Sequence, residues 1–211
     1  MTTQTLSRTE PDTQTDVPQK RLFTREEYHA MGKAGILPYD QRGIELLEGE
    51  IIVMSPTRER HAVCVDTLNY QFSTLGNLAG RAIVRVQNPA ATSPNSEPEP
   101  DLMLMAHRDD RYVSGHPGPQ DILLLVEVSD SSLRYDTNVK LRHYARVGLP
   151  EVWIANLRDD YIESYTDPSP EGYRVSRIYR PGDTISPASF PDIEIAVNDI
   201  IPSRPPEQAG E

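Results

Sequence analysis

The sequence contains little cysteine, no long hydrophobic run and few basic residues relative to acidic ones. Cys64 is the single cysteine among 211 residues, which excludes an intrachain disulfide framework and a cysteine-rich zinc site. No apolar run is long enough to span a bilayer, and the N-terminus lacks a hydrophobic signal core. We therefore expect a soluble, cytoplasmic protein that makes no membrane contact.

Basic residues are outnumbered. The chain has 21 lysines and arginines against 32 aspartates and glutamates, a formal net charge of -11. Tight nonspecific binding to nucleic acid normally depends on basic side chains that neutralise phosphates, so this balance argues against such binding. A local basic face is still compatible with it, because metal-site carboxylates and acidic tails add negative charge without facing a substrate.

The length fits one domain with a polar tail at each end. Residues 1–20 are rich in Thr, Gln, Asp and Pro and hold almost no large apolar side chain, so we expect a disordered tail. We expect residues 21–201 to form a single domain, which is long enough to bury a core. Residues 202–211 are rich in Pro and Glu and predict a flexible C-terminal tail.

The first half of this domain predicts a helix, a hairpin and a second helix. Thr24 and Glu27 have the spacing of a capping box and begin a short helix. Residues 44–54 read as two strands joined by a hairpin turn at Glu48-Gly49. After a break at Ser55-Pro56, apolar residues recur at helical spacing and indicate a long amphipathic helix from about residue 59.

Two later strands carry carboxylates. Asp101 directly precedes the apolar run 102–105, which places it at the mouth of a buried strand. Glu127 lies inside the nearly continuous aliphatic run 121–129, a pattern typical of a strand covered on both faces. Its buried charge needs a compensating cation. We expect that cation to be Lys140, on a helix predicted over residues 133–147.

The segments around these strands define the fold class. The helix over 133–147 joins two apolar strands, and a crossover of this kind makes neighbouring strands parallel and lays the helix across the sheet. Residues 161–165 and 173–179 alternate around a polar loop and predict an antiparallel hairpin. The sequence therefore predicts an α/β fold, a mixed sheet flanked by helices with additional antiparallel hairpins.

Simpler explanations exist for each charged residue. An aspartate after proline is often a turn residue, and a strand glutamate can pair with a structural arginine. Taken alone, Glu45 on the first strand favours a solvent-facing charge, and His61 at a helix start favours the surface. Lys140 and Asp136, four residues apart, are compatible with a surface ion pair. Together, however, two strand carboxylates and a lysine suit a hard divalent cation and an activated water.

Several short motifs occur in one order along the chain. They are Glu45-Leu46-Leu47-Glu48-Gly49-Glu50, Met54-Ser55-Pro56 with His61, Glu99-Pro100-Asp101, Leu125-Val126-Glu127-Val128, Tyr135-Asp136 through Lys140 to Tyr144-Ala145, and Gly148-Leu149-Pro150-Glu151-Val152-Trp153. In these motifs, and over roughly residues 22–201, the chain resembles the Uma-two family of restriction endonucleases, part of the PD-(D/E)XK nuclease superfamily.

The resemblance implies a restriction-endonuclease-like core and a metal-dependent endodeoxyribonuclease. It implies Mg²⁺, with Mn²⁺ as a substitute, DNA as the partner, and leaves a homodimer open. The implied site residues are Asp101 and Glu127 as metal ligands, Lys140 as the catalytic lysine, Glu45 as an additional acid and His61 at the rim. The superfamily usually has a lysine two positions after the glutamate, where this chain has Ser129. The resemblance moves that lysine to the following helix.

Two other functions stay open at this point. One is a noncatalytic binding or regulatory protein that retains the nuclease fold, which the net charge of -11 favours. The other is an enzyme for a nonpolymeric phosphate ester, with a small pocket instead of a groove. A basic rim around Asp101 would favour the nuclease, and an acidic rim would favour the noncatalytic protein.

Overall fold

The computed structural model describes residues 18–37, 43–74 and 78–204. Its centre is a six-stranded sheet with the order β3-β4-β5-β6-β7-β8. The bounds of these strands are β3 (Ala82–Val86), β4 (Leu102–Ala106), β5 (Ile122–Ser129), β6 (Glu151–Asn156), β7 (Tyr161–Ser169) and β8 (Gly172–Tyr179). β5 and β6 pair in parallel, and the other neighbours pair antiparallel. The predicted mixed sheet is confirmed.

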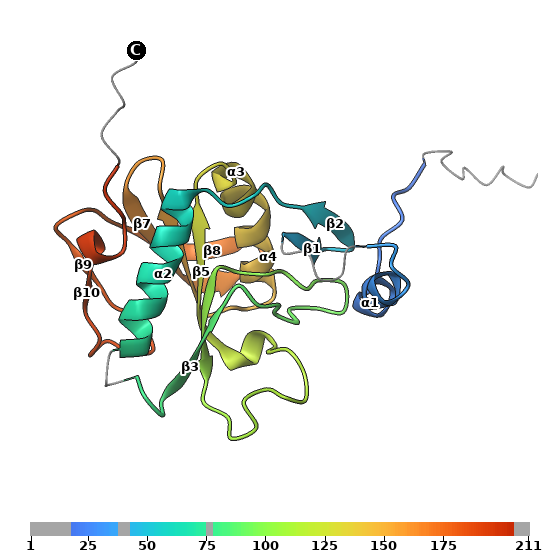
Figure 1. The fold of residues 1–211 in the computed structure, drawn as a ribbon, viewed down its shortest axis with the longest axis horizontal. Helices are drawn as coiled ribbons and strands as arrows, with labels where there is room; N and C mark the ends of the chain where they lie inside the picture. The colour runs from blue at the N-terminus through green and yellow to red at the C-terminus, as the bar shows by residue number, and fades with distance from the viewer. Residues whose placement is uncertain (1–17, 38–42, 75–77, 205–211) are drawn as a thin grey trace, which may run out of the picture.

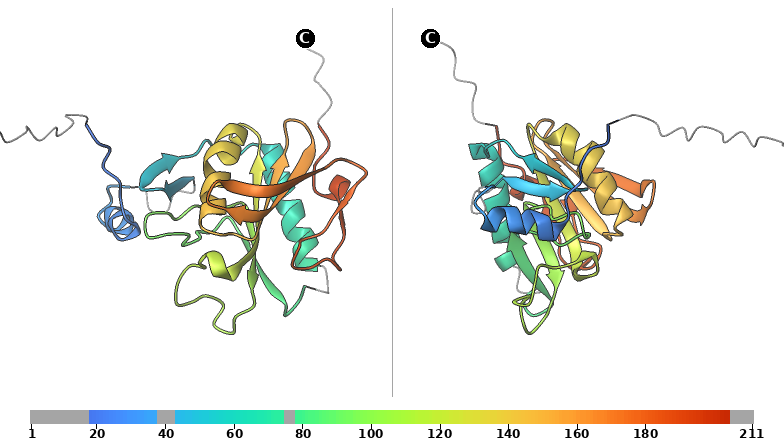
Figure 2. Two further views of the ribbon diagram at one scale, coloured as in Figure 1. Left: turned by 180° about the vertical axis from the view of Figure 1, so that it is seen from behind. Right: turned by 90° about the vertical axis from the view of Figure 1, so that its right-hand side faces the viewer.

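Helices cover both faces of this sheet, and side chains alternate between the two layers. Leu102 and Leu104 pack in one core with α2 (Glu59–Thr74), whereas Met103 and Met105 pack in the other core beneath the helical segment before β6. The right-hand view of Figure 2 shows the sheet between α2 and that segment. Alternation with period two therefore fills both layers.

The helical segment between β5 and β6 differs from the expected continuous helix. It consists of α3 (Leu133–Tyr135), a π-helical turn η2 (Asp136–Lys140) and α4 (Leu141–Arg146). Asp136 and Lys140, at the two ends of η2, are both buried. Single π-helical turns within helices are frequently found at functional sites.

A helix and a hairpin form an extension beside the main sheet (Figure 1). They are α1 (Arg25–Lys33), β1 (Ile44–Leu47) and β2 (Glu50–Val53), and β1 and β2 form a sheet of their own. The predicted turn is confirmed, with φ of 52° at Glu48 and 80° at Gly49. A Cβ at Gly49 would lie 2.6 Å from the Cβ of Leu22, so this position also needs glycine for space. The Thr24 capping box of α1 is confirmed as well.

The last described segment packs against α2. Beyond β8 follow β9 (Thr184–Ile185), β10 (Ile195–Ala196) and the 3-10 turn η3 (Val197–Asp199); the other 3-10 turn, η1 (Pro119–Asp121), precedes β5. Arg60 on α2 donates to the carbonyl oxygens of Leu157 and Pro202 and pairs with Asp160. Most of the predicted N-terminal tail, and residues 205–211, lie outside the described residues. None of the described helices is both long and apolar enough to cross a membrane.

Candidate active site

The register of the sheet brings Asp101 and Glu127 together. Leu102 pairs with Val126 in the β4–β5 ladder, so one step further along sets Asp101 opposite Glu127, with both side chains on the same face. The backbone N–H of Val128 donates to Asp101 Oδ2 at 2.8 Å, which fixes this carboxylate across the strand end. Both side chains line one pocket of about 620 Å³.

Lys140 enters the same pocket from η2. Its side chain is 3% exposed, and its Nζ lies 3.0 Å from Glu45 Oε2 and 3.3 Å from Glu127 Oε1. The predicted pairing of Lys140 with Glu127 is confirmed. The alternative of a surface ion pair with Asp136 is wrong, because the helical segment packs with Lys140 facing the sheet. Lys140 thus bridges a strand of the core and a strand of the hairpin.

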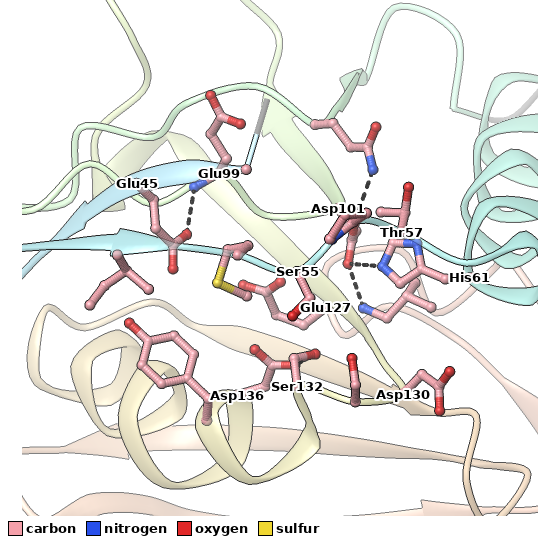
Figure 3. Close-up of a pocket in the computed structure, with 18 of the residues that line it drawn as sticks. Glu45, Ser55, Thr57, His61, Glu99, Asp101, Glu127, Asp130, Ser132 and Asp136 are labelled. Atoms are coloured by element: carbon pink, nitrogen blue, oxygen red, sulfur yellow. Dashed lines mark hydrogen bonds and ion pairs between the residues drawn. The ribbon is translucent and has the colours of Figure 1, made fainter. Parts of the chain in front are cut away.

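Glu45, on β1 of the hairpin, lines the same pocket. Its expected exposure to solvent is wrong, because only 2% of the residue is accessible. The Glu99 backbone N–H donates to Glu45 Oε2 at 3.2 Å, and Figure 3 shows this carboxylate between the hairpin and the wall that carries Asp136. The hairpin packs over the site, so a strand that reads as half-exposed in the sequence has a buried face.

Asp136 belongs to the site, although sequence reasoning assigned it only to an ion pair. Its Oδ2 accepts hydrogen bonds from Ser129 Oγ at 2.7 Å and from Ser132 Oγ at 2.6 Å. The residue is 2% exposed and lines the pocket opposite Glu45 (Figure 3). The sequence offers one indication of this contact. Side chains alternate between the two faces of a strand, so Ser129 lies on the same face as Glu127. Ser129 thus helps to hold the Asp136 carboxylate in place.

His61 and Gln87 surround the Asp101 carboxylate. His61 Nε2 lies 3.2 Å from Asp101 Oδ2, and Gln87 Nε2 donates to Asp101 Oδ1 at 3.3 Å. The preference for a surface position of His61 is wrong, because its side chain is 13% exposed and lines the pocket. Burial lowers the pKa of the His61 imidazole, but the hydrogen bond and charge of Asp101 outweigh it and raise the pKa.

Burial and charge oppose each other in this cluster. Burial alone would lower the pKa of the Lys140 ammonium, but the carboxylates of Glu127 and Glu45 outweigh burial and raise that pKa well above its ordinary value. Burial raises the pKa of the Glu127 carboxyl well above its ordinary value, and the attraction of Lys140 does not cancel this effect. Tyr144 donates to Glu127 Oε1 at 2.6 Å. Lys140 therefore keeps its proton, and a further positive charge would stabilise the pocket.

The pocket suits a hard cation in the chemistry of its donors. Carboxylate oxygens are the ligands that Mg²⁺ prefers, and Mg²⁺ is usually held by one or two carboxylates with water and substrate phosphates. Asp101 and Glu127, which both line the pocket, match this two-carboxylate pattern. Across the described ranges, no three histidine, cysteine or acidic side chains form a ready-made metal site. Asp101 and Glu127 are therefore the residues that could hold a cation.

A solved structure defines the class of fold. A crystal structure from Anabaena variabilis ATCC 29413, described as "a putative nuclease belonging to DUF820", matches with a TM-score of 0.65 and 15% sequence identity. The match covers 85% of this chain and 97% of that chain. At this identity the likeness shows the fold alone.

The family assignment follows from the sequence. The family Uma2, described as "Putative restriction endonuclease", matches residues 25–198, and the chain belongs to this family. The matched segment contains all the site residues predicted above. No curated protein matches the chain. Family membership supports a nuclease-like function.

Proposed function

We propose that this protein is a metal-dependent endonuclease that hydrolyses phosphodiester bonds of DNA in the cytoplasm, with Mg²⁺ as its cofactor and Mn²⁺ as a substitute. One observation carries the proposal. A fully buried ammonium, Lys140, joins Glu45 and Glu127 beside Asp101, within a pocket that opens to solvent. Burying these charges costs free energy, and a structural pair would have no need of a pocket around it. A homodimer stays a prediction.

Each side chain has a role in this reaction. Asp101 and Glu127 would hold the cation, which supplies a Lewis acid for the scissile phosphate and lowers the pKa of a bound water. The Val128 N–H and His61 keep the Asp101 carboxylate in place. Lys140 acts as a fixed positive charge and not as a base, because its raised pKa keeps it protonated. Its ammonium stabilises the negative charge that develops on the phosphate.

The lining of the pocket favours a second candidate, a noncatalytic protein that retains the fold. The acidic lining residues are Glu45, Glu99, Asp101, Glu127, Asp130 and Asp136. The basic lining residues are Arg58 and Lys140, and Arg58 lies 3.8 Å from Asp130. This lining is acidic, and an acidic rim repels a polyanion unless bound cations reverse the local potential.

A cleavage assay separates the two candidates. Purified protein is incubated with supercoiled plasmid, single-stranded DNA and RNA, with Mg²⁺, with Mn²⁺ and with EDTA. The proposal expects cleavage that requires the cation and that Asp101→Asn lowers by at least about a hundredfold. Asp167→Asn, at a residue more than half exposed in its side chain, is the matched control. Absence of cleavage in all three substrates, with a folded protein that binds Mn²⁺, would support the noncatalytic candidate.

A further inference from the structure

Unpartnered polar atoms gather in one place in this protein. Among the described residues, three buried side-chain atoms lack a hydrogen-bond partner, namely Glu45 Oε1, His61 Nδ1 and Tyr135 Oη. All three residues line the pocket that holds Asp101 and Lys140. An unpaired buried polar atom is costly, and native proteins rarely leave one without a reason. Three of them in one pocket point to a ligand.

Glu45 has one oxygen committed and one available. Its Oε2 contacts Lys140 Nζ at 3.0 Å and accepts from the Glu99 N–H at 3.2 Å, so the carboxylate cannot rotate without losing both contacts. The remaining Oε1 is held in a fixed direction within the pocket. As a carboxylate oxygen it can only accept hydrogen bonds.

Tyr135 lies at the end of α3, next to the buried Asp136. Its hydroxyl oxygen is buried although the residue as a whole is only partly covered. Burial, and after it the charge of Glu45, raises the pKa of the Tyr135 hydroxyl. Glu45 and Tyr135 therefore each bring one unpartnered oxygen to the same pocket, and the charge of Glu45 acts on the Tyr135 hydroxyl.

The two atoms together select the chemistry of their ligand. A group between them must donate a hydrogen bond to Glu45 Oε1, and it can accept one from Tyr135. A phosphate oxygen cannot donate, whereas an O–H group can do both. We propose that Glu45 and Tyr135 form a subsite for an O–H group, and that Tyr135 is a positioning residue of this site. The inference rests on the proposed nuclease function for its role in turnover.

Two sources supply such an O–H group. One is the water that attacks the phosphate, held with one lone pair toward Tyr135 and the other toward phosphorus. The other is the 2′-hydroxyl of a ribonucleotide, the group that distinguishes RNA from DNA. Cleavage rates on DNA and RNA of the same sequence separate the two sources. The attacking water acts on both substrates, whereas the 2′-hydroxyl is present only in RNA.

The test is Tyr135→Phe, which removes one hydroxyl and leaves the ring. Because the lost hydroxyl has no partner in the protein, we expect a melting temperature equal to or above that of the wild type. We expect kcat to fall about tenfold or more, with KM nearly unchanged. An equal fall on matched DNA and RNA oligonucleotides identifies the water, and a fall on RNA alone identifies the sugar hydroxyl.

Tyr173→Phe is the matched control. The Tyr173 hydroxyl donates to the Leu149 carbonyl at 2.8 Å, so this variant should melt at a lower temperature and keep its cleavage rates. Wild-type rates of Tyr135→Phe on both substrates would overturn the positioning role.

Crystal structures give a readout that does not depend on activity. High-resolution structures of the wild type and Tyr135→Phe should show an ordered oxygen within about 3.2 Å of both Glu45 Oε1 and Tyr135 Oη in the wild type only. No such oxygen in the wild type would overturn the subsite. If the oxygen is present and the wild type cleaves no nucleic acid, the subsite stands and the proposed function fails.

Discussion

Glu127 and Glu151 lie on neighbouring strands and differ in how their charge is accommodated. Both are 3% exposed, and burial raises the pKa of both carboxyls. Each oxygen of Glu151 accepts one bond from a neutral donor, from Trp153 Nε1 at 2.7 Å and from the Ala188 N–H at 2.7 Å. Glu127 Oε1 instead receives both Lys140 and Tyr144, and the side chain lines the pocket.

The comparison shows that burial of a charge does not by itself indicate function. A carboxylate enclosed by neutral donors is satisfied and serves the fold, as at the start of β6. A carboxylate that shares a cation with a second acid and faces a pocket remains able to bind something more. The environment of Glu151 therefore predicts a structural role, and that of Glu127 a functional one.

The largest effect should come from Lys140→Met, which removes the cation and keeps the length of the side chain. We expect cleavage to fall by at least about a hundredfold, on the scale of losing one transition-state donor. Stability should fall by about 3 kcal/mol, because Glu45 and Glu127 stay buried without their partner. Cleavage rates and urea unfolding measure the two effects, and Arg142→Met at a neighbouring exposed position is the control.

A double variant separates loss of catalysis from loss of folding. Glu127→Gln with Lys140→Met removes one of the two unpaired acids, so it should be more stable than Lys140→Met alone and equally inactive. If Lys140→Met cleaves at nearly the wild-type rate, Lys140 has no part in the mechanism. Its role is then structural, like that of Glu151.

An intermediate effect is expected in the response to metal. A ligand that binds only the native state stabilises it by about 2.7 kcal/mol at a hundredfold excess over Kd. Mn²⁺ should therefore raise the melting temperature of the wild type and of Glu151→Gln, but not that of Glu127→Gln. Differential scanning fluorimetry with and without Mn²⁺ measures this. An equal response of all three proteins would contradict the assignment of Glu127 as a ligand.

The smallest effect concerns pH and Glu151. The pKa of the Glu151 carboxyl is raised in the native state, so the native state holds this proton more tightly than the unfolded state does. The resulting stabilisation of the native state is full below the ordinary pKa of 4.5. It is lost as pH rises through the native pKa. Glu151→Gln loses one acceptor, a cost of about 1 kcal/mol, and has no such titration. The stability advantage of the wild type should therefore narrow from pH 4 to pH 7. Urea midpoints at several pH values test this, and a widening advantage would refute the burial account.

The sequence predicted the sheet better than the site. Nearly continuous apolar runs identified β5 and β6, and the crossover rule made them parallel, so the approach of Lys140 to Glu127 followed from local pattern. The burial of Glu45 depends instead on how a separate hairpin packs against a distant loop. The position of Asp136 in the site escaped prediction for a similar reason, because its contact with Ser129 on β5 forms only after the helical segment packs. Period and propensity contain no information on such contacts.

The hairpin that carries Glu45 forms a sheet of its own, and the bridge between Leu46 and Glu97 joins it to the segment that leads into β4. Without the hairpin, Lys140 and Glu127 are an ion pair of zero net charge. Docking of the hairpin adds the Glu45 carboxylate, which leaves the triad, when all three groups are ionised, with an excess of one negative charge beside the pocket. Any cation that offsets this excess must, by reciprocity, also tighten the docking of the hairpin. The strength with which a distant segment is held and the affinity for a positive ion are therefore two measures of the same free energy.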